Sequence, residues 1–376
     1  MKLGIYIHIP FCKQKCYYCD FPSYAGKEAC QDNYLDALLF EIRRASEAYQ
    51  ERVVDTVFFG GGTPSVLPKE ALPRIIKALG NSFTLADDAE ISAEANPGTV
   101  DEEKLTAWRK AGINRISFGV QSFHDSLLRS IGRIHTSEQA TDAIMLAREA
   151  GFDNINLDLI YGLPSQTVEM LQNDVKRAVS LGIEHISVYG LIVEEDTVLE
   201  QMVEEEKVTL PSDEDEEAMY DHVTTYLEEI GYHRYEISNY AKDGKVCRHN
   251  LKYWQFADYL GFGSAAHSFV GGKRFANERS IDDYIRRMTK EGTARLGDED
   301  ETMEELRGEY VFLALRTVQG VDTEDFQKTF GMDFFAQYGD IINRMMTEGL
   351  LTKDGRYIRL TKLGMKYGNR VFAQFV

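Results

Sequence analysis

The sequence predicts an α/β protein in which a parallel, barrel-like sheet is covered by helices and followed by a smaller helical domain. Short runs of β-branched and aromatic residues alternate with longer segments of helical period, which is the pattern of repeated βα units. A chain of 376 residues is also too long for one ordinary core and suits a barrel-sized domain plus a smaller one. We therefore expect two domains.

Six strands are expected in the first half of the chain: Gly4–Ile9, Thr56–Phe59, Glu90–Ala95, Arg115–Val120, Asn154–Ile160 and His185–Tyr189. Apolar residues between them recur at helical spacing, as from Tyr34 to Ile42 and from Met170 to Val179. The strands are followed in turn by HIPFC, GGGTP, EANPG, VQSF, DLIYGLP and YGLIVEE. Because barrel enzymes build their sites at the carboxyl ends of parallel strands, these segments are expected to share one site.

The second half of the chain has a different pattern. Strand signals become irregular after about Glu194, and a linker-like segment, TARLGDEDE, lies near residue 300. From Thr302 onward the pattern is typical of helices followed by a small hairpin, as in a winged helix. We predict a barrel domain over residues 1–240, a connecting segment over 241–300 and a C-terminal domain over 301–376. Acids and bases nearly balance in the last unit, which favours packing or partner contact over DNA binding.

Charge and composition argue against several classes of protein. The formal net charge of −19 would repel phosphate backbones, so no nucleic-acid partner is expected. No stretch approaches the roughly 18 apolar residues of a membrane span, and the apolar start MKLGIYIHIPF leads into cysteines instead of a cleavage site. Five cysteines, three of them within eight residues, indicate reduced, metal-binding thiols. A cytoplasmic protein is predicted.

The three closely spaced cysteines have the pattern C-x3-C-x2-C and are Cys12, Cys16 and Cys19. Three thiolates can hold a four-iron cluster and leave one iron open for a small molecule. The alternative is structural zinc, which takes four protein ligands and would need His8, Cys30 or Cys247 as the fourth. The position after a first barrel strand, with GGGTP after the second, favours the cluster.

The segment HIPFCKQKCYYCDF, together with GGGTP, resembles the radical-SAM superfamily. Within it, YIHIPFC, ISAEANPG, ISFGVQSF and NLDLIYGLP resemble the HemN/HemW family, the branch of oxygen-independent coproporphyrinogen III oxidases and haem chaperones. The similarity covers almost the whole chain. It implies a partial (β/α)6 TIM-like radical-SAM barrel with a smaller C-terminal, winged-helix-like domain.

The resemblance also implies cofactors and their binding residues. A [4Fe–4S] cluster on the three cysteines would bind S-adenosylmethionine (SAM) at its open iron, and one electron from the cluster would break the sulfonium bond to give a 5′-deoxyadenosyl radical. A reductant for the cluster is then required. Positions that match the family's SAM pocket are Tyr6, Tyr18, Gly61 and Glu94, and Gly62 and Thr63 match positions that face a neighbouring ligand site. Positions that match a second SAM site in the oxidase are Gln121, Arg133 and Asp158.

Several of these residues carry little information outside the family. Glu94 and Asp158 could equally be acids that cap strand ends, because short acidic side chains are common in such turns. Arg133 alone would be interpreted as a solvated surface arginine. The glycines of GGGTP would let the backbone approach a bound cofactor closely, since they lack a Cβ atom.

Two features separate the oxidase from the chaperone. The oxidase pattern continues to C-x3-C-x2-C-x-C, whereas Phe21 stands at that position here, and only eleven residues precede the first cysteine. The segment CRHNLKYW resembles the signature of HemW-type chaperones, and its His249, Tyr253 and Trp254 are candidate haem contacts. A histidine can ligate haem iron and aromatic rings can stack on a porphyrin. The same residues also describe a capped helix start with aromatic anchors in the core.

The sequence thus favours a haem chaperone of the HemW type, which binds haem and transfers it to an acceptor protein. The alternative is an oxygen-independent coproporphyrinogen III oxidase, which would decarboxylate coproporphyrinogen III to protoporphyrinogen IX. Expected partners are haem, an acceptor protein that could be peripheral to the membrane, and the reductant, with the chain as a monomer or homodimer. Whether SAM is ever cleaved stays open.

Overall fold

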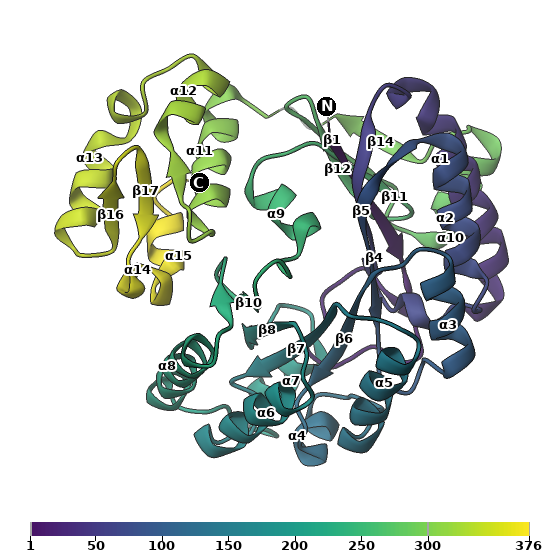
Figure 1. Ribbon diagram of the computed structural model, residues 1–376, viewed down its shortest axis with the longest axis horizontal. Helices are drawn as coiled ribbons and strands as arrows, with labels where there is room; N and C mark the ends of the chain where they lie inside the picture. The colour runs from purple at the N-terminus through teal and green to yellow at the C-terminus, as the bar shows by residue number, and fades with distance from the viewer. Residues whose placement is uncertain (1, 299–300, 376) are drawn as a thin grey trace.

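Six of the strands form a parallel array at the centre of a curved sheet in the computed structural model, which describes residues 2–298 and 301–375 (Figure 1). They are β1 (Lys2–Ile9), β4 (Val53–Gly61), β5 (Thr84–Ala95), β6 (Arg115–Gln121), β7 (Ile155–Tyr161) and β8 (His185–Gly190). Each predicted strand overlaps one of these. The partial (β/α)6 barrel expected from the sequence is confirmed.

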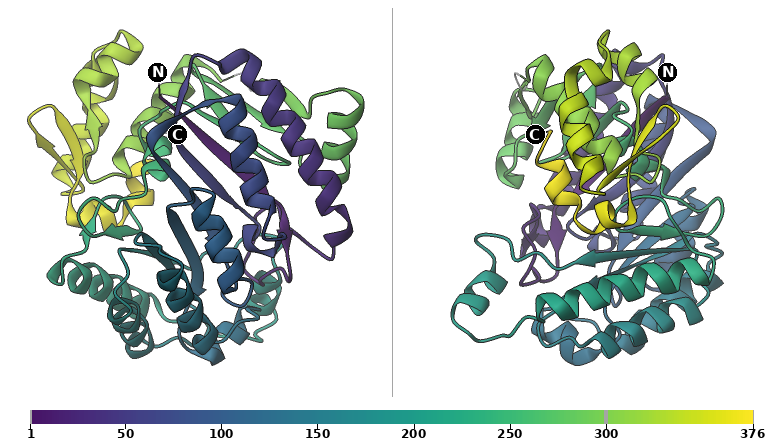
Figure 2. Two further views of the ribbon diagram at one scale, coloured as in Figure 1. Left: turned by 45° about the vertical axis from the view of Figure 1, so that its right-hand side comes forward. Right: turned by 90° about the vertical axis from the view of Figure 1, so that its left-hand side faces the viewer.

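Helices cover the convex face of this sheet (Figures 1 and 2). They include α1 (Gln31–Tyr49), α2 (Ala71–Ser82), α3 (Glu102–Lys110), α5 (Ser137–Glu149), α6 (Val168–Ser180) and α8 (Asp213–Glu229). Along β1, the alternating residues Leu3, Ile5, Ile7 and Ile9 are fully buried in the core beneath these helices. Side chains alternate across a strand, so Tyr6 and His8 point to the concave side.

The sheet extends beyond the six strands at both edges. β11 (Tyr259–Phe262) pairs in parallel with β1, and β12 (His267–Val270), β13 (Lys273–Asn277) and β14 (Arg295–Asp298) continue from it as antiparallel strands. At the other edge, β10 (Asn239–Ala241) is antiparallel to β8, and β9 (His233–Arg234) is antiparallel to β10. The predicted connecting segment therefore contributes strands to the main sheet, which the sequence analysis did not expect.

A short helix, α9 (Arg248–Trp254), lies on the concave side of the sheet (Figure 1). Its N-cap residue, Cys247, makes no side-chain capping bond. Glu90 on β5 replaces that cap, since its carboxylate accepts from the backbone N–H groups of Arg248 and His249, each at 3.1 Å. Lys252 adds an ion pair of 2.7 Å with Asp55, and both side chains are almost completely buried. The helix is thus anchored to two neighbouring strands.

The C-terminal residues form a separate apolar core. The elements are α11 (Met303–Leu315), β15 (Val321–Asp322), α12 (Thr323–Phe330), α13 (Phe334–Thr347), the hairpin β16 (Leu351–Asp354) and β17 (Tyr357–Leu360), α14 (Lys362–Lys366) and α15 (Gly368–Phe372). Helices followed by a hairpin give the expected winged-helix arrangement. Phe256 joins this unit to the barrel through ring contacts with Tyr310 and Phe330.

Two further expectations from the sequence concern the domain boundaries and membrane-spanning segments. The domain boundaries at residues 240 and 300 stay a prediction, and residues 299–300 lie outside the described residues. In the described part of the chain, no helix is both long enough and apolar enough to cross a membrane.

The contact between Glu90 and α9 can be tested by substitution. Glu90→Ala leaves two backbone N–H groups without a partner in a buried setting, so we expect a loss of about 1–3 kcal/mol in the free energy of unfolding. Glu90→Gln keeps an oxygen acceptor and should lose less. Urea denaturation of both variants checks this, and an alanine variant as stable as the wild type would contradict the capping role.

Candidate functional site

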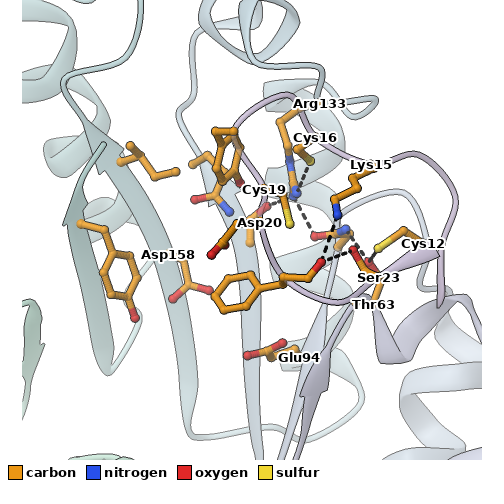
Figure 3. A pocket seen from close by; sticks show the side chains of 18 of the residues that line it. Cys12, Lys15, Cys16, Cys19, Asp20, Ser23, Thr63, Glu94, Arg133 and Asp158 are labelled. Carbon is orange, nitrogen blue, oxygen red and sulfur yellow. Dashed lines mark hydrogen bonds between the residues drawn. The ribbon is translucent and has the colours of Figure 1, made fainter. Parts of the chain in front are cut away.

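A cavity of about 440 Å³ opens at the carboxyl ends of the parallel strands, and we call it the cluster cavity (Figure 3). Cys12 from β2 (Phe11–Cys12) and the following Cys16 and Cys19 all line it. No three His, Cys, Asp or Glu side chains in residues 2–298 and 301–375 converge as a single metal ion would require. The thiols instead surround one space, as ligands of a cluster several ångströms across would.

The candidates for a fourth zinc ligand have other partners. Cys30 lies 3.9 Å from a carboxylate oxygen of Asp282, and Cys247 lies 3.8 Å from one of Glu90. His8 is hydrogen-bonded through Nε2 to the carbonyl oxygen of Pro22 and through Nδ1 to the hydroxyl of Tyr6. Cys30, Cys247 and His8 are outside the lining of the cluster cavity. The arrangement favours the three-thiolate interpretation.

Most residues assigned to SAM or a neighbouring ligand by resemblance line the same cavity. They are Tyr18, Gly61, Gly62, Thr63, Glu94, Gln121, Arg133 and Asp158. Tyr6 is the exception, because it lines two neighbouring cavities. Asn96 and Tyr189 also line the cluster cavity, although no motif had marked them as site residues. Asn96 belongs to EANPG, one of the segments that follow a predicted strand, and this position could have marked it as a site residue.

The glycines of GGGTP are required by packing within the protein. Gly61 has φ +110°, and a Cβ atom there would lie 2.5 Å from the ring of His8. A Cβ on Gly62 would lie 2.7 Å from the carbonyl oxygen of Phe11. The loop after β4 therefore packs directly on the end of β1. This differs from the expected reason, which was close approach to the cofactor.

Polar side chains connect the thiols to the strand ends. Thr63 Oγ1 lies 3.5 Å from Cys12 Sγ and accepts from the Asn96 amide at 3.0 Å. Arg133 donates to Asn96 Oδ1 at 2.7 Å, to the carbonyl oxygen of Gly119, and to Cys16 Sγ at 3.5 Å. Arg133 is therefore a partner of the thiols and not a solvated surface residue. A guanidinium in this place can donate to a thiolate.

Two acids face the inner end of the cluster cavity (Figure 3). Burial, reinforced by the charge of Asp158, raises the pKa of Glu94 to about 8. Burial also raises the pKa of Asp158, although Asn156 and Ser117 donate to its carboxylate at 2.8 and 3.1 Å. Near neutral pH, Glu94 is thus largely protonated and can donate as well as accept a hydrogen bond.

A second cavity, of about 430 Å³, lies between the concave side of the sheet and α11, and we call it the aromatic cavity. Its lining includes Tyr6, Phe21, Tyr253, Trp254, Phe256, Tyr259, His267 and Phe269. The guanidinium of Arg316 lies 4.6 Å from the centre of the Trp254 ring. Two of the three predicted haem contacts, Tyr253 and Trp254, are therefore brought together here.

His249, the third predicted haem contact, is completely buried and outside the lining of the aromatic cavity. Its Nδ1 lies 2.9 Å from Thr56 Oγ1, its Nε2 lies 2.8 Å from the hydroxyl of Tyr253, and its ring stacks on Phe58. Burial lowers the pKa of His249 to about 3, so the imidazole is neutral. Ligation of iron would require it to give up a hydrogen bond.

Comparison with known proteins identifies the family. The "Radical SAM superfamily" matches residues 6–178, and the "HemN C-terminal domain" matches residues 302–366. The chain is 38% identical to the heme chaperone HemW of Bacillus subtilis, over 99% of this chain and 98% of that protein. The chain belongs to the HemW family. The HemW of Escherichia coli is 42% identical over 71% of this chain and 70% of its own length.

A solved structure agrees with this assignment. The coproporphyrinogen III oxidase HemN of Escherichia coli, described as a radical SAM enzyme, superimposes with a TM-score of 0.87 at 27% identity. The match covers 99% of this chain and 89% of that one. The barrel and the C-terminal unit of the HemW family member described here thus both have counterparts in that oxidase.

The raised pKa of Glu94 has a testable consequence for stability. Folding favours the protonated carboxyl, so this group's contribution to stability is present below about pH 4.5 and is lost as the pH rises to about 8. The free energy of unfolding should therefore fall more steeply between pH 5 and 8 in the wild type than in Glu94→Gln. Urea denaturation across this pH range without SAM measures it. Parallel pH profiles would contradict the assignment.

Proposed function

We propose that this chain is a haem chaperone, which binds haem and passes it to an acceptor protein. The observation that carries the proposal is the match to HemW proteins over nearly the full length of the chain. The aromatic cavity supports it, because large aromatic rings provide an apolar surface for a porphyrin face. The proposal does not require turnover of SAM.

The cluster cavity is proposed to hold a [4Fe–4S] cluster and SAM. Cys12, Cys16 and Cys19 would be the iron ligands, and the open side of the cavity leaves room for a small molecule beside them. When bound, the cluster would supply the electron for cleavage of the sulfonium bond of SAM. Arg133 and Thr63 would orient the thiolates, and Glu94 would meet polar groups of SAM. Tyr6 as a SAM contact stays a prediction.

Haem is proposed to bind in the aromatic cavity against Tyr253 and Trp254. His249 supports this site through Tyr253, since the hydrogen bond between them fixes the position of the phenol. Direct contact between His249 and haem stays a prediction. His267 offers another imidazole, because its side chain is exposed and lines the cavity. Imidazole is a common axial ligand of haem iron.

The oxidase reaction is the less favoured alternative. Phe21 stands where the oxidase pattern has a fourth cysteine, and its side chain is 62% exposed. It lines both the cluster cavity and the aromatic cavity, so a bulky ring separates the two where the oxidase pattern has a thiol. A porphyrin in the aromatic cavity would meet this ring before it reached the thiols.

Partners and location follow from the same proposal. A chaperone needs an acceptor protein, which could be peripheral to the membrane, and a redox-active cluster needs a reductant. The described cysteines are free thiols, which supports a reducing compartment, and we place the protein in the cytoplasm. We propose no oligomeric state beyond monomer or homodimer, and no nucleic acid.

The cluster is tested by anaerobic reconstitution. The chain should take up about four iron atoms and show broad visible absorption, and both should be lost when any of Cys12, Cys16 or Cys19 becomes Ala. Cys30→Ala is the matched control, because that thiol lies outside the cavity. Binding of zinc without iron under the same conditions would refute the cluster.

The haem site is tested by titration. The chain should bind about one haem and form no protoporphyrinogen from coproporphyrinogen III, even with SAM and a strong reductant. Trp254→Ala removes an aromatic wall and should weaken haem binding about two- to tenfold. Phe335→Ala, an exposed ring on α13, is the control. Rapid decarboxylation of coproporphyrinogen III by the wild type would show instead that the protein is an oxidase.

A further inference from the structure

A third cavity, of about 220 Å³, lies inside the barrel between the two cavities already described, and we call it the inner chamber. It shares Glu94, Asp158 and Tyr189 with the cluster cavity, and Tyr6 and Tyr253 with the aromatic cavity. Its volume lies below the range of about 300–1,000 Å³ that holds a complete drug-sized ligand. It can hold one substituent of a ligand that is bound mainly in an adjacent cavity.

Arg115, from β6, lines this chamber and is only 2% exposed. Its Nε atom is buried without a hydrogen-bond partner, and within the described residues the guanidinium makes neither a hydrogen bond nor an ion pair. A buried cation without partners is costly, and in native proteins such a group signals a missing water or ligand. The fork of a guanidinium matches a carboxylate.

The acids closest to Arg115 in charge interaction are already engaged elsewhere. Glu90 caps α9, and Asp158 receives hydrogen bonds from Ser117 and Asn156. Glu94 also faces the chamber, and its raised pKa reduces the repulsion that it would exert on an incoming anion. The amide of Asn250 also lines the chamber, whereas the hydroxyl of Ser187 already donates to Asn156 Oδ1 and the hydroxyls of Tyr6 and Tyr253 are already hydrogen-bonded to histidines. The chamber therefore holds one buried guanidinium whose Nε lacks a hydrogen-bond partner among the described residues, beside the hydrogen-bonded carboxylate of Asp158.

We propose that Arg115 is the binding site for a carboxylate of a ligand that reaches into the inner chamber. Two ligands of this protein would carry such a group. A porphyrin in the aromatic cavity could extend a propionate past Tyr6 and Tyr253, and SAM in the cluster cavity could direct its carboxylate inward. Binding of a haem propionate rests on the proposed haem function, whereas binding of the SAM carboxylate does not.

The test compares ligands with and without carboxylates on the full-length, reconstituted protein. Absorbance titration in one detergent buffer gives the affinities for haem and for haem dimethyl ester, and calorimetry gives those for SAM and decarboxylated SAM. Each pair is measured with the wild type, Arg115→Met, Arg115→Lys and Arg109→Met. Arg109 is a matched control, because it lies on α3 and donates to the carbonyl oxygen of Gly151 at the surface.

If the source is the porphyrin, the wild type should prefer haem over its dimethyl ester by about ten- to hundredfold, as expected for a charge-assisted hydrogen bond. Arg115→Met should remove this preference, Arg115→Lys should keep part of it, and Arg109→Met should keep all of it. If SAM supplies the carboxylate, the wild type should bind SAM more tightly than decarboxylated SAM, and Arg115→Met should reduce that preference.

Unchanged preferences for both ligand pairs in Arg115→Met would mean that the chamber holds only water, and the proposal would be wrong. If the methionine variant does not fold, Arg115→Lys decides the question, because the preference for one of the two carboxylate ligands must then be smaller than in the wild type. If both preferences equal those of the wild type, the proposal is wrong. Absence of haem binding by the wild type would refute the chaperone function but leave the SAM comparison to judge Arg115.

Discussion

Glu90 joins the parts of the candidate site, because its carboxylate holds the first backbone N–H groups of α9 while its own strand, β5, carries Glu94 near its end, in the same cavity as the thiols. This contact fixes α9 on the concave side of the sheet. Tyr253 and Trp254 then face the aromatic cavity, and His249 fills the space between Thr56 and Tyr253. Without the cap, two buried backbone N–H groups at the start of the helix would lose their acceptor.

The barrel therefore has a polar interior between the cluster cavity and the aromatic cavity. The cluster cavity lies at the carboxyl ends of the strands, the aromatic cavity lies against the C-terminal unit, and the inner chamber adjoins both. An ordinary barrel core is filled by apolar side chains. Here Arg115, Ser117, Asn156 and Asp158 take that place, so the interior can recognise charge and hydrogen-bonding groups. Such an interior suits a protein that must hold a ligand and later release it.

Much of the fold could be predicted from the sequence, because β-branched runs and helical periods are local signals. The edge strands β11 to β14 could not, since they are short and partly polar and gain stability only by pairing with β1 and one another. The three cysteines could be singled out from their spacing and their position after the first strand, and their role as cluster ligands stays a prediction. The surroundings of Arg133 and His249 could not be predicted by pattern, because they depend on contacts with residues more than a hundred positions away, such as Cys16 and Thr56. The unpaired guanidinium of Arg115 has no sequence signal.

We propose that one chain holds a cluster and haem in two separate cavities on either side of a shared interior. A crystal structure of the reconstituted protein with haem bound tests this most directly, with iron located by anomalous scattering. We expect four iron atoms beside Cys12, Cys16 and Cys19 and one haem iron in the aromatic cavity, with the porphyrin against Tyr253 and Trp254. A haem iron outside the aromatic cavity, or iron absent from the three cysteines, would contradict the account.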